Sequence, residues 1–107
     1  MVAGPAENYL IFESTRKRQS EEQILYVFRL KGEDSLRLEA RVANGHIEFR
    51  MRGLTKWSDV PDSEGAQVEY DKDNPNEVPM VVFPEDSGRE NIPLANLLEQ
   101  RPGSGNS

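Results

Sequence analysis

Few residues in this chain have the type and spacing that catalysis requires. The sequence contains one histidine, His46, and no cysteine, which excludes disulfides, thiolate metal sites and a cysteine nucleophile. Acid–base catalysis or metal binding by His46 would need partner side chains, and the sequence places only Ala43 opposite it. No phosphate-binding glycine loop and no glycine-framed serine is present. We therefore expect a protein that is not an enzyme and that uses no cofactor and no metal.

Two charged segments could still bind an ion or a nucleic acid. Residues 71–77 (DKDNPNE) alternate carboxylates as calcium loops do, but proline stands where such a loop needs glycine, so an ordinary hairpin loop is favoured. Arg16-Lys17-Arg18 is a basic triplet that a phosphate backbone could contact. Acidic residues follow it almost at once, so we favour a solvated loop there as well.

The most regular pattern in the chain is RLEARVANGHIEFRMRG, residues 37–53. Asn44-Gly45 between two alternating runs predicts a β-hairpin with a type I′ turn, and a two-residue turn fixes the strand register. The expected apolar pairs are Val42–Ile47, Ala40–Phe49 and Leu38–Met51, and the pairs on the opposite face are Ala43–His46, Arg41–Glu48, Glu39–Arg50 and Arg37–Arg52. We expect the two opposite-charge pairs to be exposed.

One pair of this hairpin places like charges across the strands. Arg37 opposite Arg52 is mildly destabilising unless a carboxylate or an anionic ligand lies between them. The second half of the chain, residues 54–107, carries eleven Asp/Glu against four Lys/Arg. We therefore predict that Arg37 or Arg52 contacts an acidic residue from positions 59–90. If both arginines pointed into solvent, they would instead mark a partner site.

Other short patterned runs predict the elements that must position these side chains. Strands are expected at 8–13, 24–31, 66–70 and 78–83, and a helix at 93–100. Leu94, Leu97 and Leu98 share one face of that helix and match an LxxLL groove-binding motif, but a helix this short must pack its leucines on its own sheet. The fold class predicted is mainly β, a small antiparallel β-sandwich or partly open barrel with a short C-terminal helix. We expect a flexible N-terminus (1–7), one domain (8–101) and a flexible tail (102–107).

Trp57 is the only tryptophan, in a polar loop after the hairpin. The sequence favours a core position for it, closing one end of a small barrel, while an aromatic on a loop can also be a binding site. The leading functional hypothesis is a protein-interaction or assembly module, with a protein partner or a second copy of the chain. Its expected partner-binding residues are the following: Arg37, Arg41, Arg50, Arg52 and Trp57.

Two other functions compete with that hypothesis. The first is a carbohydrate- or ligand-binding β-sandwich that uses Trp57 with Tyr9, Tyr26 or Tyr70. The second is nucleic-acid binding through the basic triplet and the Arg37/Arg52 end of the hairpin, which the net charge of −6 disfavours. No long apolar segment or signal-like start is visible, so we expect no membrane association, and a cytoplasmic location is favoured.

Overall fold

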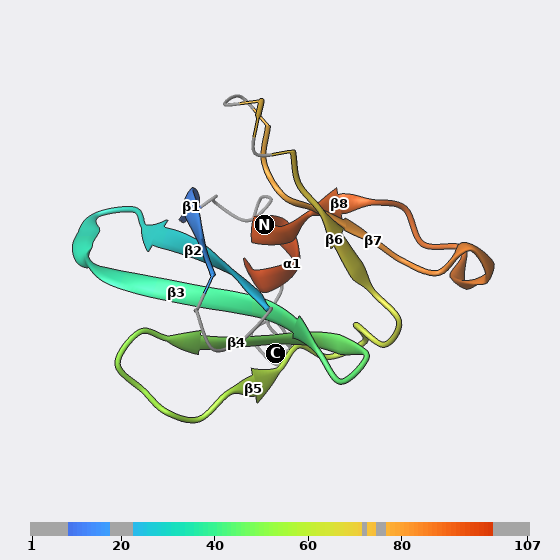
Figure 1. Ribbon diagram of the computed structural model, residues 1–107, viewed down its shortest axis with the longest axis horizontal. Coiled ribbons are helices and arrows are strands. Elements are labelled where there is room, and N and C mark those ends of the chain that lie inside the picture. The colour runs from blue at the N-terminus through green and yellow to red at the C-terminus, as the bar shows by residue number, and fades with distance from the viewer. Residues whose placement is uncertain (1–8, 18–22, 72, 75–76, 100–107) are drawn as a thin grey trace, which may run out of the picture.

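The computed structural model describes residues 9–17, 23–71, 73–74 and 77–99. Within them the chain forms two open antiparallel sheets and one short C-terminal helix (Figure 1). The mainly β fold predicted from the sequence is confirmed, and the sheets do not close into a barrel. The predicted flexible ends, 1–7 and 102–107, lie outside the described residues. Among those residues, no helix has the length and apolar character that crossing a bilayer requires.

The larger sheet contains five strands in the order in which they follow one another along the chain. They are β1 (Leu10–Lys17), β2 (Ile24–Leu30), β3 (Glu33–Ala43), β4 (His46–Met51) and β5 (Ser58–Asp59). The smaller sheet has the order β6-β7-β8, followed directly by the helix. This part of the chain contains β6 (Gln67–Glu69), β7 (Met80–Val82), the short 3-10 helix η1 (Glu85–Ser87), β8 (Ile92–Pro93) and the helix α1 (Leu94–Glu99).

The hairpin of β3 and β4 has the register that the sequence predicts. All six predicted pairs from Ala43–His46 to Leu38–Met51 are present, and the Arg52 amide donates to the Arg37 carbonyl at 2.9 Å, which extends the hairpin by one more pair. Asn44 and Gly45 have φ values of 57° and 81°, as a type I′ turn requires. Asparagine and glycine tolerate this conformation, so the turn sets which side chains share a face.

The hydrophobic core lies between the two sheets and the helix. Phe28, Ala40 and Ile47 come from the larger sheet, Val81 from the smaller one, and all are fully buried. In Figure 1, α1 lies between the sheets, and it packs against β1, β7 and β8. The three leucines of α1 are buried in the same cluster, which confirms that they seat the helix on its own domain.

Three strands differ from the sequence-based prediction. β1 continues to Lys17, whereas we expected the strand to end at Glu13. A register shift between Phe12 and Ser14 marks a β-bulge that interrupts the alternation of side chains, and such an interruption hides a strand from a period-two pattern. Neither β5 nor β8 was predicted, because a two-residue strand is too short to carry a pattern.

Candidate functional site

The face of the five-stranded sheet that points away from the core carries most of the charged side chains of β3 and β4. We call it the outer face; its residues alternate with the core residues along each strand. Of the five residues predicted to bind a partner, the structure brings together four: Arg41, Arg50, Arg52 and Trp57. Arg37 belongs to a separate group of contacts farther along β3.

The carboxylate of Glu39 is the centre of the outer face. It accepts hydrogen bonds from Arg16 Nη1 at 3.1 Å, from Arg50 Nε at 3.1 Å and from Arg52 Nε at 3.3 Å. Glu39 is 1% exposed, so the exposed position that we expected for its pair with Arg50 is wrong. The reason is that its neighbour across the strands, Val27, is an equally buried apolar residue of this face. A carboxylate removed from water in this way requires cationic partners.

The prediction for Arg37 and Arg52 is wrong in the source of the carboxylates. Arg37 Nε donates to Glu13 at 2.8 Å, and Arg52 contacts Glu39, so both acids come from the first half of the chain and neither lies in residues 59–90. Glu13 is the additional residue of the bulge in β1, which places it beside the sheet face that holds Arg37. Glu39 is the diagonal neighbour of Arg52 across the hairpin, a distance that a long side chain can span.

Trp57 lies on the outer face and not in the core. The guanidinium carbons of Arg41 and Arg50 lie over its ring, 4.0 Å and 4.5 Å from the centroid, within the range of a cation–π interaction. In β5, Asp59 pairs with Glu48 and the preceding residue with the core-facing Phe49, so alternation returns Trp57 to the outer side. The expected core position of Trp57 is therefore wrong, and the indole is half-buried beneath charged groups.

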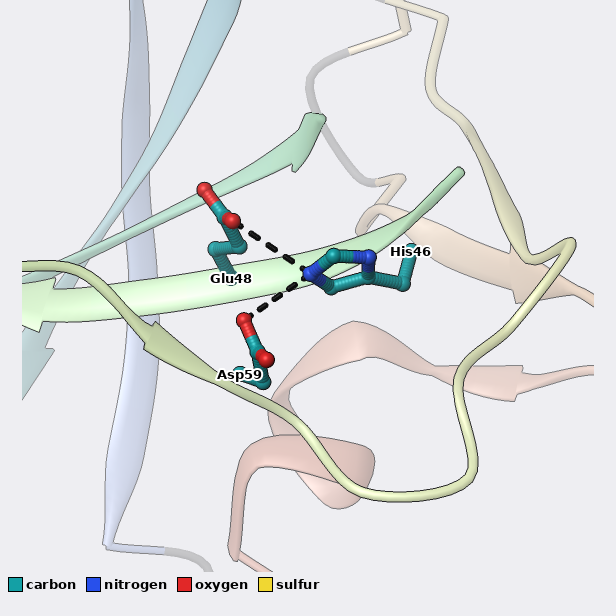
Figure 2. A group of neighbouring side chains, drawn as sticks. All are labelled: His46, Glu48 and Asp59. Atoms are coloured by element: carbon teal, nitrogen blue, oxygen red, sulfur yellow. Dashed lines mark hydrogen bonds and ion pairs between the residues drawn. The ribbon is translucent and has the colours of Figure 1, made fainter. Parts of the chain in front are cut away.

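His46 has two acidic partners in the structure (Figure 2). Its Nε2 atom is 2.9 Å from Asp59 Oδ1 and 3.3 Å from Glu48 Oε2, and its Nδ1 atom is 3.2 Å from the Asn44 carbonyl oxygen. Both ring nitrogens thus face acceptors, and only the imidazolium can donate from both. Glu48 is itself buried, and its Oε1 atom accepts from Arg41 Nε at 2.9 Å. The exposed position that we expected for the Arg41–Glu48 pair is therefore also wrong.

This environment shifts the protonation of His46. The hydrogen bond to Asp59 raises the pKa of His46 above its ordinary value, and partial desolvation opposes that increase. The hydrogen bond to the Asn44 carbonyl and the negative charges of Asp59 and Glu48 raise this pKa further. His46 therefore carries its positive charge at a higher pH than a free imidazole would.

Comparisons with protein-family models, with curated proteins and with solved structures gave no match. The site is therefore interpreted from its own contacts.

One partner of His46 could have been predicted from the sequence. His46 and Glu48 are two residues apart in a strand and must share a face, so the sequence already places one carboxylate beside the imidazole. Asp59 could not be placed, because it reaches His46 through the two-residue strand β5. The same short pairing brings Trp57 to the arginines of the outer face.

The structure does not assemble the described residues of the two alternative sites, the carbohydrate site and the nucleic-acid site, as the sequence suggested. Tyr26 projects into the core from β2, where burial raises the pKa of its hydroxyl, so it cannot form one platform with Trp57 on the outer face. Tyr26 and Tyr70 instead line a cleft of about 440 Å³ with residues of β1. Of the basic triplet, Arg16 is engaged by Glu39, and Arg18 lies outside the described residues.

Proposed function

We propose that this chain is a non-enzymatic interaction module that binds an acidic segment of a partner protein on the outer face. The observation that carries the proposal is the position of Trp57, half-buried on that face with the guanidinium groups of Arg41 and Arg50 over its ring. Tryptophan and arginine are the residues that most often dominate binding energy at protein interfaces. Here they are held in place by the sheet before any partner arrives, which reduces the entropic cost of binding.

The charge of the outer face supports an acidic partner. Around Trp57 and Glu39 the arginines outnumber the carboxylates that they contact. The arginines are Arg16, Arg41, Arg50 and Arg52, and the carboxylates are Glu39 and Glu48. This local positive surplus lies in a chain whose net charge is −6, so a negatively charged segment would be attracted to this face and repelled elsewhere. The acidic second half of another copy of the chain meets the same requirement.

The two alternatives receive less support from these contacts. A sugar would have to stack on the Trp57 ring where Arg41 and Arg50 already lie. A nucleic acid is negatively charged along its whole length, so the acidic chain, with its net charge of −6, would repel it beyond this face. The cleft beside Tyr26 and Tyr70 has a volume typical of small-ligand sites, but it does not include Trp57.

The proposal can be tested with the fluorescence of Trp57, the only tryptophan. We expect a saturable change in its emission when an alternating Glu/Leu peptide is added, and none with the matching Lys/Leu peptide. The variants R41Q and R50Q should each weaken binding about tenfold, the loss expected for one charge-assisted contact. R89Q is the matched control, because Arg89 lies over the ring of Phe83 at 3.7 Å, away from the outer face.

Several results would contradict this function. One is a Trp57 emission that does not change when the acidic peptide is added, and another is a change of equal size with the basic peptide. A third is a loss of peptide binding in R89Q as large as the loss in R41Q. Sedimentation of the protein alone then distinguishes the source of the acidic segment. Self-association that is abolished by R41Q would identify a second copy as the partner, and a monomer that binds the peptide would indicate a different protein.

A further inference from the structure

We propose that His46, Glu48 and Asp59 form a binding site for a divalent transition-metal ion of the zinc type. The three residues lie at the turn end of the outer face, where β4 meets β5 (Figure 2). They offer one imidazole nitrogen and two carboxylate oxygens, and these three atoms lie within 4.8 Å of one another. The proposal does not depend on the partner-binding function of the outer face.

Two of the three distances between these atoms match those of ligands bound to one ion. His46 Nε2 is 2.9 Å from Asp59 Oδ1 and 3.3 Å from Glu48 Oε2. Ligand atoms that each lie about 2.1 Å from a zinc ion at tetrahedral or right angles are about 3.0–3.4 Å apart. The ion would replace the proton on Nε2, which leaves to solvent, and the two carboxylate oxygens, which lie within 4.8 Å of each other, would move toward the shared ion. Water would complete the coordination.

Groups outside the triad hold two of the ligands in the orientation that a metal needs. The Nδ1 atom of His46 faces the carbonyl of Asn44 at 3.2 Å, so Nδ1 can keep its proton while Nε2 presents its lone pair to an ion. A backbone carbonyl in this role is typical of histidine ligands. Asn44 is itself held at positive φ by the type I′ turn, which fixes the position of that carbonyl.

Glu48 is oriented by a residue outside the triad. It is 7% exposed, and Arg41 binds its Oε1 atom through Nε and Nη2 at 2.9 Å and 2.8 Å. The Oε2 atom is thereby aimed at His46. On the other side, the side chain of Asp59 is 72% exposed, which leaves an open route for a hydrated ion.

The donor set indicates which ions would bind. Imidazole nitrogen with carboxylate oxygen suits zinc and similar transition metals, whereas magnesium prefers oxygen ligands alone and retains its water. Two carboxylates beside one neutral imidazole also give the site a negative charge that favours a divalent cation. Arg41 offsets part of that charge through Glu48.

The experiment is a calorimetric titration of the full chain with zinc chloride after treatment with EDTA, with the His46 imidazole followed by NMR. We expect binding of one zinc ion per chain, a shift of the His46 resonances that saturates at the same ratio, and no saturable binding of magnesium. H46Q and D59N should each lower the zinc affinity at least about tenfold. D34N is the matched control, since Asp34 is an exposed carboxylate in contact with Arg29 on another part of the sheet, and it should bind zinc as the wild type does.

Each contrary result overturns the proposal. The first such result is the absence of zinc binding at millimolar concentration. The second is zinc binding that is unchanged in H46Q and D59N, because the ion would then bind elsewhere, for example at residues 71–77. An equal loss of affinity in D34N would show a nonspecific effect of surface charge. Circular dichroism of each variant establishes that the fold is intact, and the His46 resonances of the wild type report coordination without any substitution.

Discussion

The substitution E39Q tests whether the buried carboxylate of the outer face holds the arginine cluster together. Glutamine preserves the shape of the side chain but removes the charge that three guanidinium groups share. A hydrogen bond to a charged group contributes about 1.5–3 kcal/mol when it is buried. Arg16 and Arg52 are each 45% exposed, so they can return to water and their contributions are much smaller. We therefore expect E39Q to lower the free energy of unfolding by about 2 kcal/mol.

Urea unfolding followed by circular dichroism measures this change directly. For a domain of this size, a loss of about 2 kcal/mol corresponds to a decrease in Tm of about 8–16 °C. E13Q is the control, because the pair of Glu13 with Arg37 is partly exposed and should contribute less than about 1 kcal/mol. If E39Q were as stable as the wild type, or no less stable than E13Q, the arginines would be solvated and Glu39 would not organise the outer face.

Three further predictions concern the turn end of the sheet and the helix. In metal-free buffer, the His46 resonances should titrate above the ordinary imidazole pKa of about 6.5, and D59N should move the midpoint toward that value. Because the pKa of His46 is raised in the folded state, the stability that His46 contributes is present below about pH 6.5 and is lost as the pH rises through the folded-state pKa. D59N should therefore destabilise the protein more at about pH 5.5 than at about pH 8.5. Equal destabilisation at the two pH values would contradict this linkage. L97A should lower the free energy of unfolding by about 2–5 kcal/mol because Leu97 is buried, whereas L54A, at a leucine that is 59% exposed, should change it by less than about 0.5 kcal/mol. A mild effect of L97A in denaturant unfolding would show that the helix leucines are not part of the core.

The hairpin and the helix could be predicted because local signals determine them. The Asn44-Gly45 turn fixes its own register, and three leucines at helical spacing need a surface to cover. Those signals place every side chain of residues 38–51 on the correct face. They do not report burial, which depends on what the neighbouring strand contributes. Glu39 is buried because β2 presents an apolar residue beside it.

The contacts that assemble the site could be predicted only in part. Arg41–Glu48 and Glu39–Arg50 follow from the register and are confirmed. The pairing of Arg37 with Glu13 depends on a β-bulge, and bulges leave little trace in a single sequence. The positions of Trp57 and Asp59 depend on β5, whose two residues pair with β4 but are too few to show an alternating pattern in the sequence.

The most direct test of the outer face as a binding surface is an amide NMR map of the labelled protein with the acidic Glu/Leu peptide. We predict that the chemical-shift changes fall on β3, on β4 and on the indole of Trp57, and that the strands β6 to β8 stay unperturbed. These changes should be reduced in R41Q and unchanged in R89Q. Changes that centre on the smaller sheet or on the cleft beside Tyr70, or no changes at all, would contradict the account of this protein as an interaction module that uses the outer face.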